Sequence, residues 1–176
     1  MKDQDKIEFL KLYQPVHEQF CRFCRFISGN TEDAEDLVHD SVLSVLESFE
    51  KIKDKSAFKS YLFSVAGNLN KMRFRKRKFK AIFDEKEYNK IIDVGQNQEY
   101  IVEFGLIYDK ILSLPAKISE ALILFHISDL SLEEIQKIQG GSLSGVKLRL
   151  KRGREKLLSS LSSPAELKMA LIFFTF

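Results

Sequence analysis

Five residues on one predicted helix combine side chains that can bind a single nucleic-acid strand. They are Tyr61, Ser64, Asn68, Lys71 and Arg75, whose spacing of three and four residues places them on one helical face. An aromatic ring can stack on a base, an amide can hydrogen-bond a base edge, and cations can follow the phosphate backbone. The alternative is that Tyr61 lies at the edge of the core and the cations only increase solubility. Residues 71–80 contain seven Lys or Arg and no acid, which favours the nucleic-acid interpretation.

A second group of cations lies on the predicted helix over residues 143–161. Residues 147–156 carry six bases and one acid. With the apolar side chains turned inward, the bases form two rows, Lys147, Lys151 and Arg154 on one flank and Arg149, Arg152 and Lys156 on the other. Two such rows beside a slim ridge suit the major groove of duplex DNA, with base contacts from Ser142 and Ser144 at the helix start. The alternative is an ordinary amphipathic surface helix.

Residues 29–50 have the opposite charge, with seven acids and no Lys or Arg. Asp33, Asp36 and Asp40 share one predicted helical face, and Glu32 and Glu35 lie beside them. An acidic face repels nucleic acid, so it indicates either a basic protein partner or a face that meets only water. Some of these acids also act as helix start signals, and spacing alone leaves both interpretations open.

Candidate catalytic and metal sites are weak. His17, Cys21 and Cys24 lie at i, i+4 and i+7 and could hold zinc, but no fourth ligand is evident. The two cysteines would pack equally well as small apolar residues next to Phe20 and Phe23. The sequence contains no glycine-rich phosphate loop, nucleophile elbow or evident pair of catalytic carboxylates. We therefore predict no catalytic residues, no resident metal and no cofactor.

Composition excludes several classes of protein. The 176 residues are 44% hydrophobic, and 28 Lys and Arg nearly balance 25 Asp and Glu. Two Cys cannot form a disulfide scaffold, so we expect the cytoplasm, where thiols stay reduced. The sequence begins without the apolar core of a signal peptide, and it has no run of about 18 apolar residues that would predict a membrane span.

The hydrophobic pattern predicts helices along most of the chain. Apolar residues recur at three and four within residues 5–27, 31–49 and 56–78, which predicts three helices. Residues 81–105 lose this periodicity and are acidic. Beyond residue 106, Pro115 breaks the helical pattern, Ser131 caps a short helix, and Gly140 and Gly141 form a turn before the basic helix. A short helix, a glycine turn and a basic helix are typical of a helix-turn-helix.

The predicted fold is all-α, with two small helical domains joined by a linker. The expected boundaries are 1–80 for the first domain, 81–105 for an acidic linker, 106–161 for a helix-turn-helix domain and 162–176 for an apolar tail. Ser163 and Glu166 have the spacing of a capping box that opens a helix in this tail. We expect the tail to pack against the body or a partner, and the alternative is a segment prone to aggregation.

Several motifs resemble those of sigma factors of the extracytoplasmic-function type, in the same order. Residues 34–40, AEDLVHD, resemble the polymerase-binding motif of that family. Residues 58–68, FKSYLFSVAGN, are similar to the segment that captures the minus-ten promoter element, with Tyr61 where the family usually has Trp. Leu114 and Pro115 resemble the opening of the fourth conserved region. Residues 130–157 are similar to the helix-turn-helix that binds the minus-thirty-five element.

The resemblance implies an initiation factor that binds core RNA polymerase and directs it to promoter DNA, with an anti-sigma factor as a candidate further partner. The polymerase-binding residues would be Asp33, Glu35, Asp36, Leu37 and Asp40. The minus-ten residues would be Tyr61, Ser64, Asn68, Lys71, Arg73 and Arg75. The minus-thirty-five residues would be Ser142, Ser144, Lys147, Arg149, Lys151 and Arg152. The residues also fit a stand-alone helix-turn-helix regulator of duplex DNA and, less well, a pure adaptor protein.

Some positions depart from the family pattern. Met72 stands where the family usually has Asp, and Gln136 and Gln139 replace small and apolar residues. Ser144 and Gly145 invert a common Gly-Thr pair. These departures predict altered packing of the helix-turn-helix and an unusual promoter preference.

Overall fold

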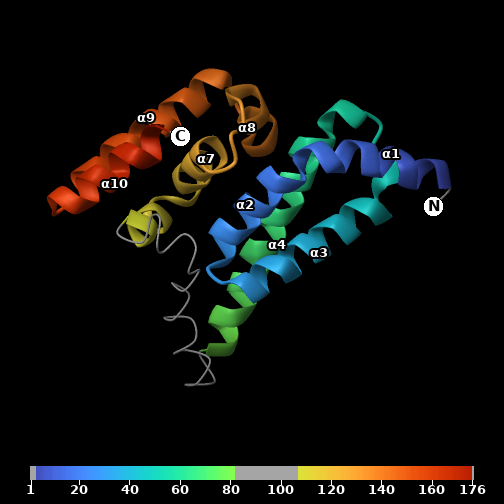
Figure 1. Cartoon of the computed structure of the whole chain (residues 1–176), viewed down its shortest axis with the longest axis horizontal. Helices are drawn as coiled ribbons and strands as arrows, with labels where there is room; N and C mark the ends of the chain where they lie inside the picture. The colour runs from blue at the N-terminus through green and yellow to red at the C-terminus, as the bar shows by residue number, and fades with distance from the viewer. Residues whose placement is uncertain (1–2, 82–106, 176) are drawn as a thin grey trace. The chain divides into compact units, whose positions relative to one another are not determined.

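The computed structural model describes residues 3–81 and 107–175, and these ranges contain helices and short connections with no strand. The chain divides into two compact units, Met1–Asn97 and Gln98–Phe176 (Figure 1). The predicted all-α class with two helical domains is therefore confirmed. The predicted linker over residues 81–105 lies outside the described residues except at its first position.

The first unit is built from α-helices joined by short 3-10 turns. They are α1 (Asp3–Tyr13), η1 (Gln14–Val16), α2 (His17–Ser28), α3 (Thr31–Glu47), η2 (Phe49–Lys51), η3 (Lys55–Ala57) and α4 (Phe58–Ala81). The prediction of one continuous helix over residues 5–27 is wrong, because the chain changes to 3-10 geometry around Pro15. Proline has no backbone N–H to donate and its ring clashes with the preceding turn, so it breaks the α-helix.

The connection between α2 and α3 fixes where the acidic face begins. Gly29 ends α2 at φ 82°, in the left-handed region that favours glycine. Asn30 caps α3, since its Oδ1 accepts a hydrogen bond from the Asp33 N–H at 2.8 Å. Glu32 and Asp33 then lie in the first turn, where the helix dipole favours negative charge.

Phenylalanine rings fill the core of the first unit. The Phe9 ring of α1 meets the rings of Phe49 and Phe58 edge-on, with centroids 5.5 and 5.3 Å apart. The Phe63 ring of α4 lies 5.3 Å from that of Phe20 and 5.2 Å from that of Phe23, both on α2. Such contacts add to the stabilisation from apolar burial. They hold α4 along one side, and its opposite side displays polar residues.

The second unit is a helix-turn-helix with supporting helices. Residues 107–113 are helical and precede α7 (Ala116–His126), α8 (Leu132–Gln139), α9 (Leu143–Ser159) and α10 (Pro164–Thr175). Ser131 and Glu134 form a capping box at the start of α8. Gly140 and Gly141 have φ angles of 71° and 88°, which favour glycine and turn the chain sharply into α9. The predicted short helix, glycine turn and basic helix are all present.

The helices α7 and α9 approach each other closely at Gly153. A Cβ on this residue would lie 2.9 Å from the Ile118 Cγ2 and 3.0 Å from the Leu122 Cγ, inside van der Waals contact. Val146, Leu150 and Leu157 are buried on the same side of α9, as the sequence predicts. The basic helix is thereby fixed on its support, and its remaining surface faces outward.

The apolar tail packs against its own unit as α10. The Ser163 Oγ accepts a hydrogen bond from the Glu166 N–H at 3.2 Å, and the Glu166 carboxylate accepts one from the Ser163 N–H at 3.1 Å. Ala170 and Phe173 are fully buried, and α10 contacts α7 and α9. Leu171 on its outer face is exposed. None of the described helices is both long enough and apolar enough to cross a bilayer.

Candidate nucleic-acid interface

The predicted strand-binding stripe lies along one side of α4. Asn68, Lys71 and Arg75 are exposed, and Tyr61 is 39% exposed. Ser64 is half-buried, and its hydroxyl donates to the Ser60 carbonyl at 2.8 Å. The structure therefore brings an aromatic ring, an amide and two cations together on one rigid helix. Ser64 instead uses its hydroxyl within the helix.

The aromatic ring of the stripe is fixed at its hydroxyl end. The Tyr61 hydroxyl lies 3.3 Å from the Ser48 Oγ, at the residue that ends α3. The Ser48 hydroxyl also approaches the Ser44 carbonyl, at 2.8 Å. A ring that is held at its edge can still stack its face on a base. Because the ring is already oriented, it loses little conformational freedom when the base binds.

Met72 lies beside this stripe and not in the core. The hydrophobic pattern groups it with the buried residues of α4, but its side chain is 48% exposed. Phe74, two residues later, is also 52% exposed. The side chain that replaces the family's usual Asp is thus an exposed apolar one, four residues after Asn68. It can contact a base or sugar but cannot accept a hydrogen bond as a carboxylate does.

The acidic face of α3 displays most of the predicted polymerase-binding residues. Glu35, Asp36 and Asp40 are exposed, and Asp33 is half-buried in the first turn. Leu37 is fully buried, so it holds α3 on the core and has no surface for a partner. Sequence reasoning missed Leu43, which is 54% exposed on the same side as Asp36 and Asp40. The only sign of Leu43 in the sequence is that it is an apolar residue outside the spacing of the buried residues of α3.

Arg73 points toward the acidic helix. Its Nη2 forms an ion pair with the Asp40 carboxylate, and its Nη1 donates to the Asp33 carbonyl at 3.2 Å. The side chain is 23% exposed. A residue predicted to contact DNA and a residue predicted to contact the polymerase are therefore bonded to each other.

The basic helix α9 carries its cations on an exposed surface. Lys147, Lys151 and Arg152 are exposed, together with Ser142 and Ser144 at the helix start. The Ser142 Oγ caps the helix by accepting from the Gly145 N–H at 3.1 Å. Leu148, 45% exposed, lies on the ridge between the two rows of cations. The exposed side of α9 therefore presents the positive charge that favours contact with DNA phosphates.

Arg149 braces the turn of the helix-turn-helix. Its Nη1 donates to the Gln139 Oε1 at 2.7 Å and its Nη2 to the Gly140 carbonyl at 3.3 Å. The Gln139 Nε2 in turn donates to the Lys117 carbonyl and to the Glu120 carboxylate, both at 3.0 Å. Gln139 thus joins α7, α8 and α9 through hydrogen bonds, where the family has apolar packing. The contacts of Gln139 in this chain are therefore polar, whereas the prediction of altered packing compares the chain with its family and stays a prediction.

A buried histidine and a half-buried arginine join α7, α9 and α10, and sequence reasoning missed this cluster. His126 is 4% exposed, and its ring centroid lies 4.9 Å from that of Phe173. The Arg154 Nη2 lies 3.4 Å from the His126 Nε2, and the Arg154 guanidinium lies between the Phe125 and Phe174 rings. Burial, and secondly the charge of Arg154, lower the pKa of His126 to about 4. The histidine is therefore neutral at pH 7.

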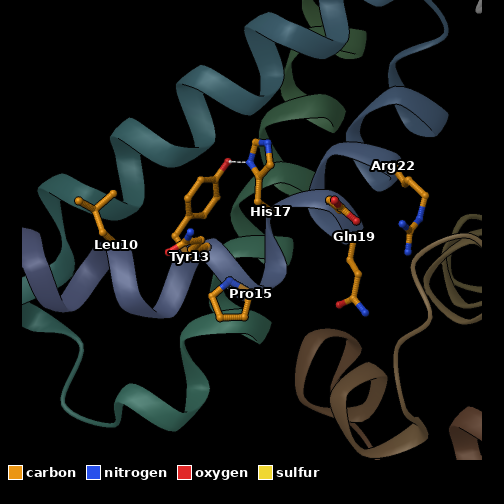
Figure 2. Close-up of a pocket in the computed structure, with 8 residues that line it drawn as sticks. Leu10, Tyr13, Pro15, His17, Gln19 and Arg22 are labelled. Carbon is orange, nitrogen blue, oxygen red and sulfur yellow. Dashed lines mark hydrogen bonds between the residues drawn. The ribbon is translucent and has the colours of Figure 1, made fainter.

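The cysteines and histidine of α2 do not converge on one point. The His17 Nδ1 is hydrogen-bonded to the Tyr13 hydroxyl at 2.8 Å (Figure 2). The Cys21 Sγ lies 3.7 Å from the His17 Nε2, whereas Cys24 is fully buried and burial raises the pKa of its thiol. Throughout residues 3–81 and 107–175, no group of three His, Cys, Asp or Glu could hold a metal ion.

The surface beside His17 is hollowed by about 850 Å³ and is lined by residues of α1, η1 and α2 (Figure 2). Its lining mixes apolar and polar side chains, among them Leu10, Pro15 and Arg22. Burial raises the pKa of Tyr13 to about 12, so this phenol stays protonated and acts only through hydrogen bonds.

Two conserved regions of one protein family match this chain. The family Sigma-70 region 2 matches residues 12–80, and the family Sigma-70, region 4 matches residues 104–157. The first match covers the acidic face of α3 and the stripe of α4. The second covers the helix-turn-helix.

Whole proteins give the same result. The ECF RNA polymerase sigma factor SigW of Bacillus subtilis is 28% identical in an alignment 173 positions long that covers 92% of this chain and 92% of the relative. The ECF RNA polymerase sigma factor EcfG of Rhodopseudomonas palustris is 30% identical over 139 residues, 79% of this chain and 77% of the relative. The solved structure of the sigma factor RpoE from Bartonella quintana, in complex with the anti-sigma factor NepR, has a TM-score of 0.66 at 22% identity, over 86% of this chain and 95% of that one. The chain therefore belongs to the sigma-70 family and is a sigma factor of the extracytoplasmic-function type.

Proposed function

We propose that this sigma factor directs RNA polymerase to its promoters through three surfaces made by its own residues. The acidic face of α3 binds core polymerase, the stripe of α4 captures the minus-ten strand, and the exposed side of α9 binds the minus-thirty-five duplex. The observation that carries the proposal is that each set of charges is displayed on a helix whose opposite side is buried. The charges are thereby pre-organised before any partner binds.

The acidic face acts by charge complementarity with a basic partner surface. Glu35, Asp36 and Asp40 supply the negative charge, which steers association and fixes its register. Leu43 supplies an exposed apolar side chain at the same face. Apolar contacts surrounded by charges are where binding energy concentrates in protein interfaces. Leu37 contributes by anchoring α3.

The stripe of α4 acts on a strand that has left the duplex. The Tyr61 ring stacks on an unpaired base, the Asn68 amide bonds a base edge, and Lys71 and Arg75 follow the phosphates. Ser64 sits beneath this path with its hydroxyl turned into the helix. Capture of one base out of the stack stabilises the opened promoter.

The helix α9 acts on duplex DNA. Lys147, Lys151 and Arg152 contact phosphates, and Ser144 reaches base edges from the helix start. Ser142 combines its capping role with an exposed position beside Ser144, whose Oγ lies 3.0 Å away. Arg149 contributes by stiffening the turn that sets the angle of α9, since its guanidinium is engaged with α8 and the turn.

The protein acts by binding, and the polymerase carries out the chemistry. We assign residues 1–80 to the polymerase and minus-ten domain, 106–161 to the minus-thirty-five domain, 81–105 to the linker and 162–176 to the tail. Because we propose RNA polymerase and promoter DNA as its partners, we propose that it acts in the cytoplasm. The structure of RpoE was solved in complex with the anti-sigma factor NepR, and that of CnrH in complex with the cytosolic domain of CnrY. An anti-sigma factor is therefore a partner to test for this chain.

The test is a run-off transcription assay on promoters selected from genomic DNA. We expect specific transcripts only when core polymerase and this chain are both present. In the contrary outcome, the chain alone binds these promoters as tightly as the chain with core polymerase does, with no transcript in the complete reaction. That result would show a stand-alone regulator. As a control, a variant with Arg152→Gln and Lys151→Gln should lose recruitment to duplex promoters and keep its affinity for core polymerase.

A further inference from the structure

Arg73 occupies an unusual position among the cations of α4. Along α4, Lys71 and Arg75 are exposed on the stripe, whereas Arg73 turns back onto α3. Its guanidinium spans one side of α3 from the Asp33 carbonyl to the Asp40 carboxylate, about two turns apart. The planar guanidinium suits this position, because two of its nitrogens donate in fixed directions to two separate acceptors.

This geometry leaves Asp40 partly open to a partner. The Asp40 side chain is 58% exposed and the Arg73 side chain only 23%. The carboxylate therefore has one oxygen held by α4 and a second that can accept a bond from outside. A carboxylate that is fixed in this way loses little rotamer freedom when a basic partner binds it.

We propose that Arg73 is a positioning residue for polymerase binding, because it orients Asp40 and fastens the first half of α3 to α4. This inference rests on the proposed function of the acidic face and assigns Arg73 to it, not to DNA. Through the same bond, α3 and α4 move as one body. Docking of the acidic face on the polymerase therefore also sets the position of the strand-binding stripe.

The test measures two affinities in parallel for variants of the full chain. One is the affinity for core polymerase, and the other is the affinity of the saturated holoenzyme for a minus-ten single-stranded oligonucleotide at several salt concentrations. The variants are Arg73→Gln, Arg73→Lys, Asp40→Asn and the double variant Arg73→Gln with Asp40→Asn. Arg75→Gln is the matched control, since it removes a neighbouring cation that lies on the stripe.

We expect Arg73→Gln to weaken core binding about fivefold and Asp40→Asn about tenfold. The double variant should also lose about tenfold, because Arg73 acts through Asp40. Arg73→Lys should resemble Arg73→Gln, since a single ammonium cannot hold both acceptors. The salt slope of oligonucleotide binding should stay at the wild-type value for both Arg73 variants and fall by about one for Arg75→Gln.

Other outcomes overturn the inference. A lower salt slope for Arg73→Gln, with Arg73→Lys close to wild type, would make Arg73 a phosphate contact. Unchanged core affinity in Arg73→Gln, or a double variant that loses the full product of the two single effects, would show that Arg73 does not position Asp40. If Asp40→Asn itself leaves core affinity unchanged, the proposed polymerase surface fails, and the inference fails with it. Circular dichroism of each variant identifies any that do not fold.

Discussion

Tyr61 is the residue on which promoter opening should depend most. Its ring is 39% exposed and held at the hydroxyl end by Ser48. We expect Tyr61→Ala to slow open-complex formation by about tenfold or more, because a stacked aromatic contributes roughly 1–3 kcal/mol. Closed-complex formation, which precedes strand separation, should change much less. Stopped-flow fluorescence of a base analogue in the minus-ten element measures the first step, and filter binding measures the second.

The control for this prediction is Tyr61→Phe, which keeps the ring and removes only the contact with Ser48. We expect it to open promoters at close to the wild-type rate. Equal losses in both steps for Tyr61→Ala would contradict a role in strand capture.

Residue types revealed most of the candidate surfaces, but not the partners of individual side chains. The stripe of α4 follows from a spacing of three and four along a helix, and the structure displays Tyr61 and Asn68 on its exposed side as expected. Arg73 and Arg149 carry the same charge as their neighbours, and only tertiary structure shows that their guanidinium groups are bonded inside the protein. Periodicity fixes the direction of a side chain but not the neighbour it meets.

At the level of elements, the contact of α9 with α7 depends on the absence of a side chain at Gly153. We expect Gly153→Ala to destabilise the second unit by about 1–2 kcal/mol. The added methyl group would lie within 3.0 Å of Ile118 and Leu122, and such overpacking costs roughly 1–3 kcal/mol, partly offset by the higher helix propensity of Ala. Urea unfolding measures the change.

The matched control is Gly145→Ala on the same helix. Its Cβ would meet only the Ser142 Oγ at 3.3 Å and the Arg149 Nη2 at 3.7 Å. Because the contact with Arg149 is at ordinary van der Waals distance and Ser142 lies at the exposed helix start, where its hydroxyl needs to move by only a few tenths of an ångström, we expect a change within about 0.5 kcal/mol. A Gly153→Ala variant as stable as this control would show that α7 can move away from α9 at no cost.

The contact of α10 with α7 should make the second unit sensitive to acid. Folding lowers the pKa of His126 from 6.5 to about 4, so between these values the unfolded chain binds a proton that the folded chain does not. Stability from this group is complete above about pH 6.5 and is lost as the pH falls toward 4, by up to about 1.4 kcal/mol per pH unit. Urea unfolding at several pH values, followed by NMR signals of the second unit, measures the slope.

His126→Gln should reduce that slope by the contribution of one proton, even if the variant is less stable at every pH. His39→Gln is the control, because His39 is exposed on α3 in the first unit. An unchanged slope in His126→Gln would mean that the histidine is protonated in the folded state. Sequence reasoning had no signal for this cluster, since an isolated His within an apolar helix gives no sign of its charge state.

Helix boundaries were predictable where local chemistry decides them. Asn30, Ser131 and the glycine pair at 140–141 are local signals, and each marks the start or end of a helix in the structure. The break at Pro15 was missed because the apolar spacing continues across it. The polar network around Gln139 could be located from its departure from the family pattern, but its partners depend on how α7, α8 and α9 pack together.

At the level of the whole molecule, the proposed function assigns separate steps of initiation to the two units. We expect the effects of Tyr61→Ala and Arg152→Gln to add as free energies of promoter-dependent transcription, because the residues belong to different units and share no partner. Abortive-initiation assays on the two single variants and the double variant measure this, with promoter concentration varied to separate recruitment from opening. A double variant that is clearly less impaired than the product of the single effects would indicate that both residues act on one step.

The close approach at Gly153 has a practical consequence for anyone who wishes to retarget this protein. Promoter specificity could be rewritten by grafting the DNA-reading segment from another member of the family. A donor helix with any larger residue at position 153 would clash with Ile118 and Leu122 of α7 and could not pack as closely. The exchangeable cassette is therefore the whole segment from α7 through α8 to α9, transplanted as a single piece.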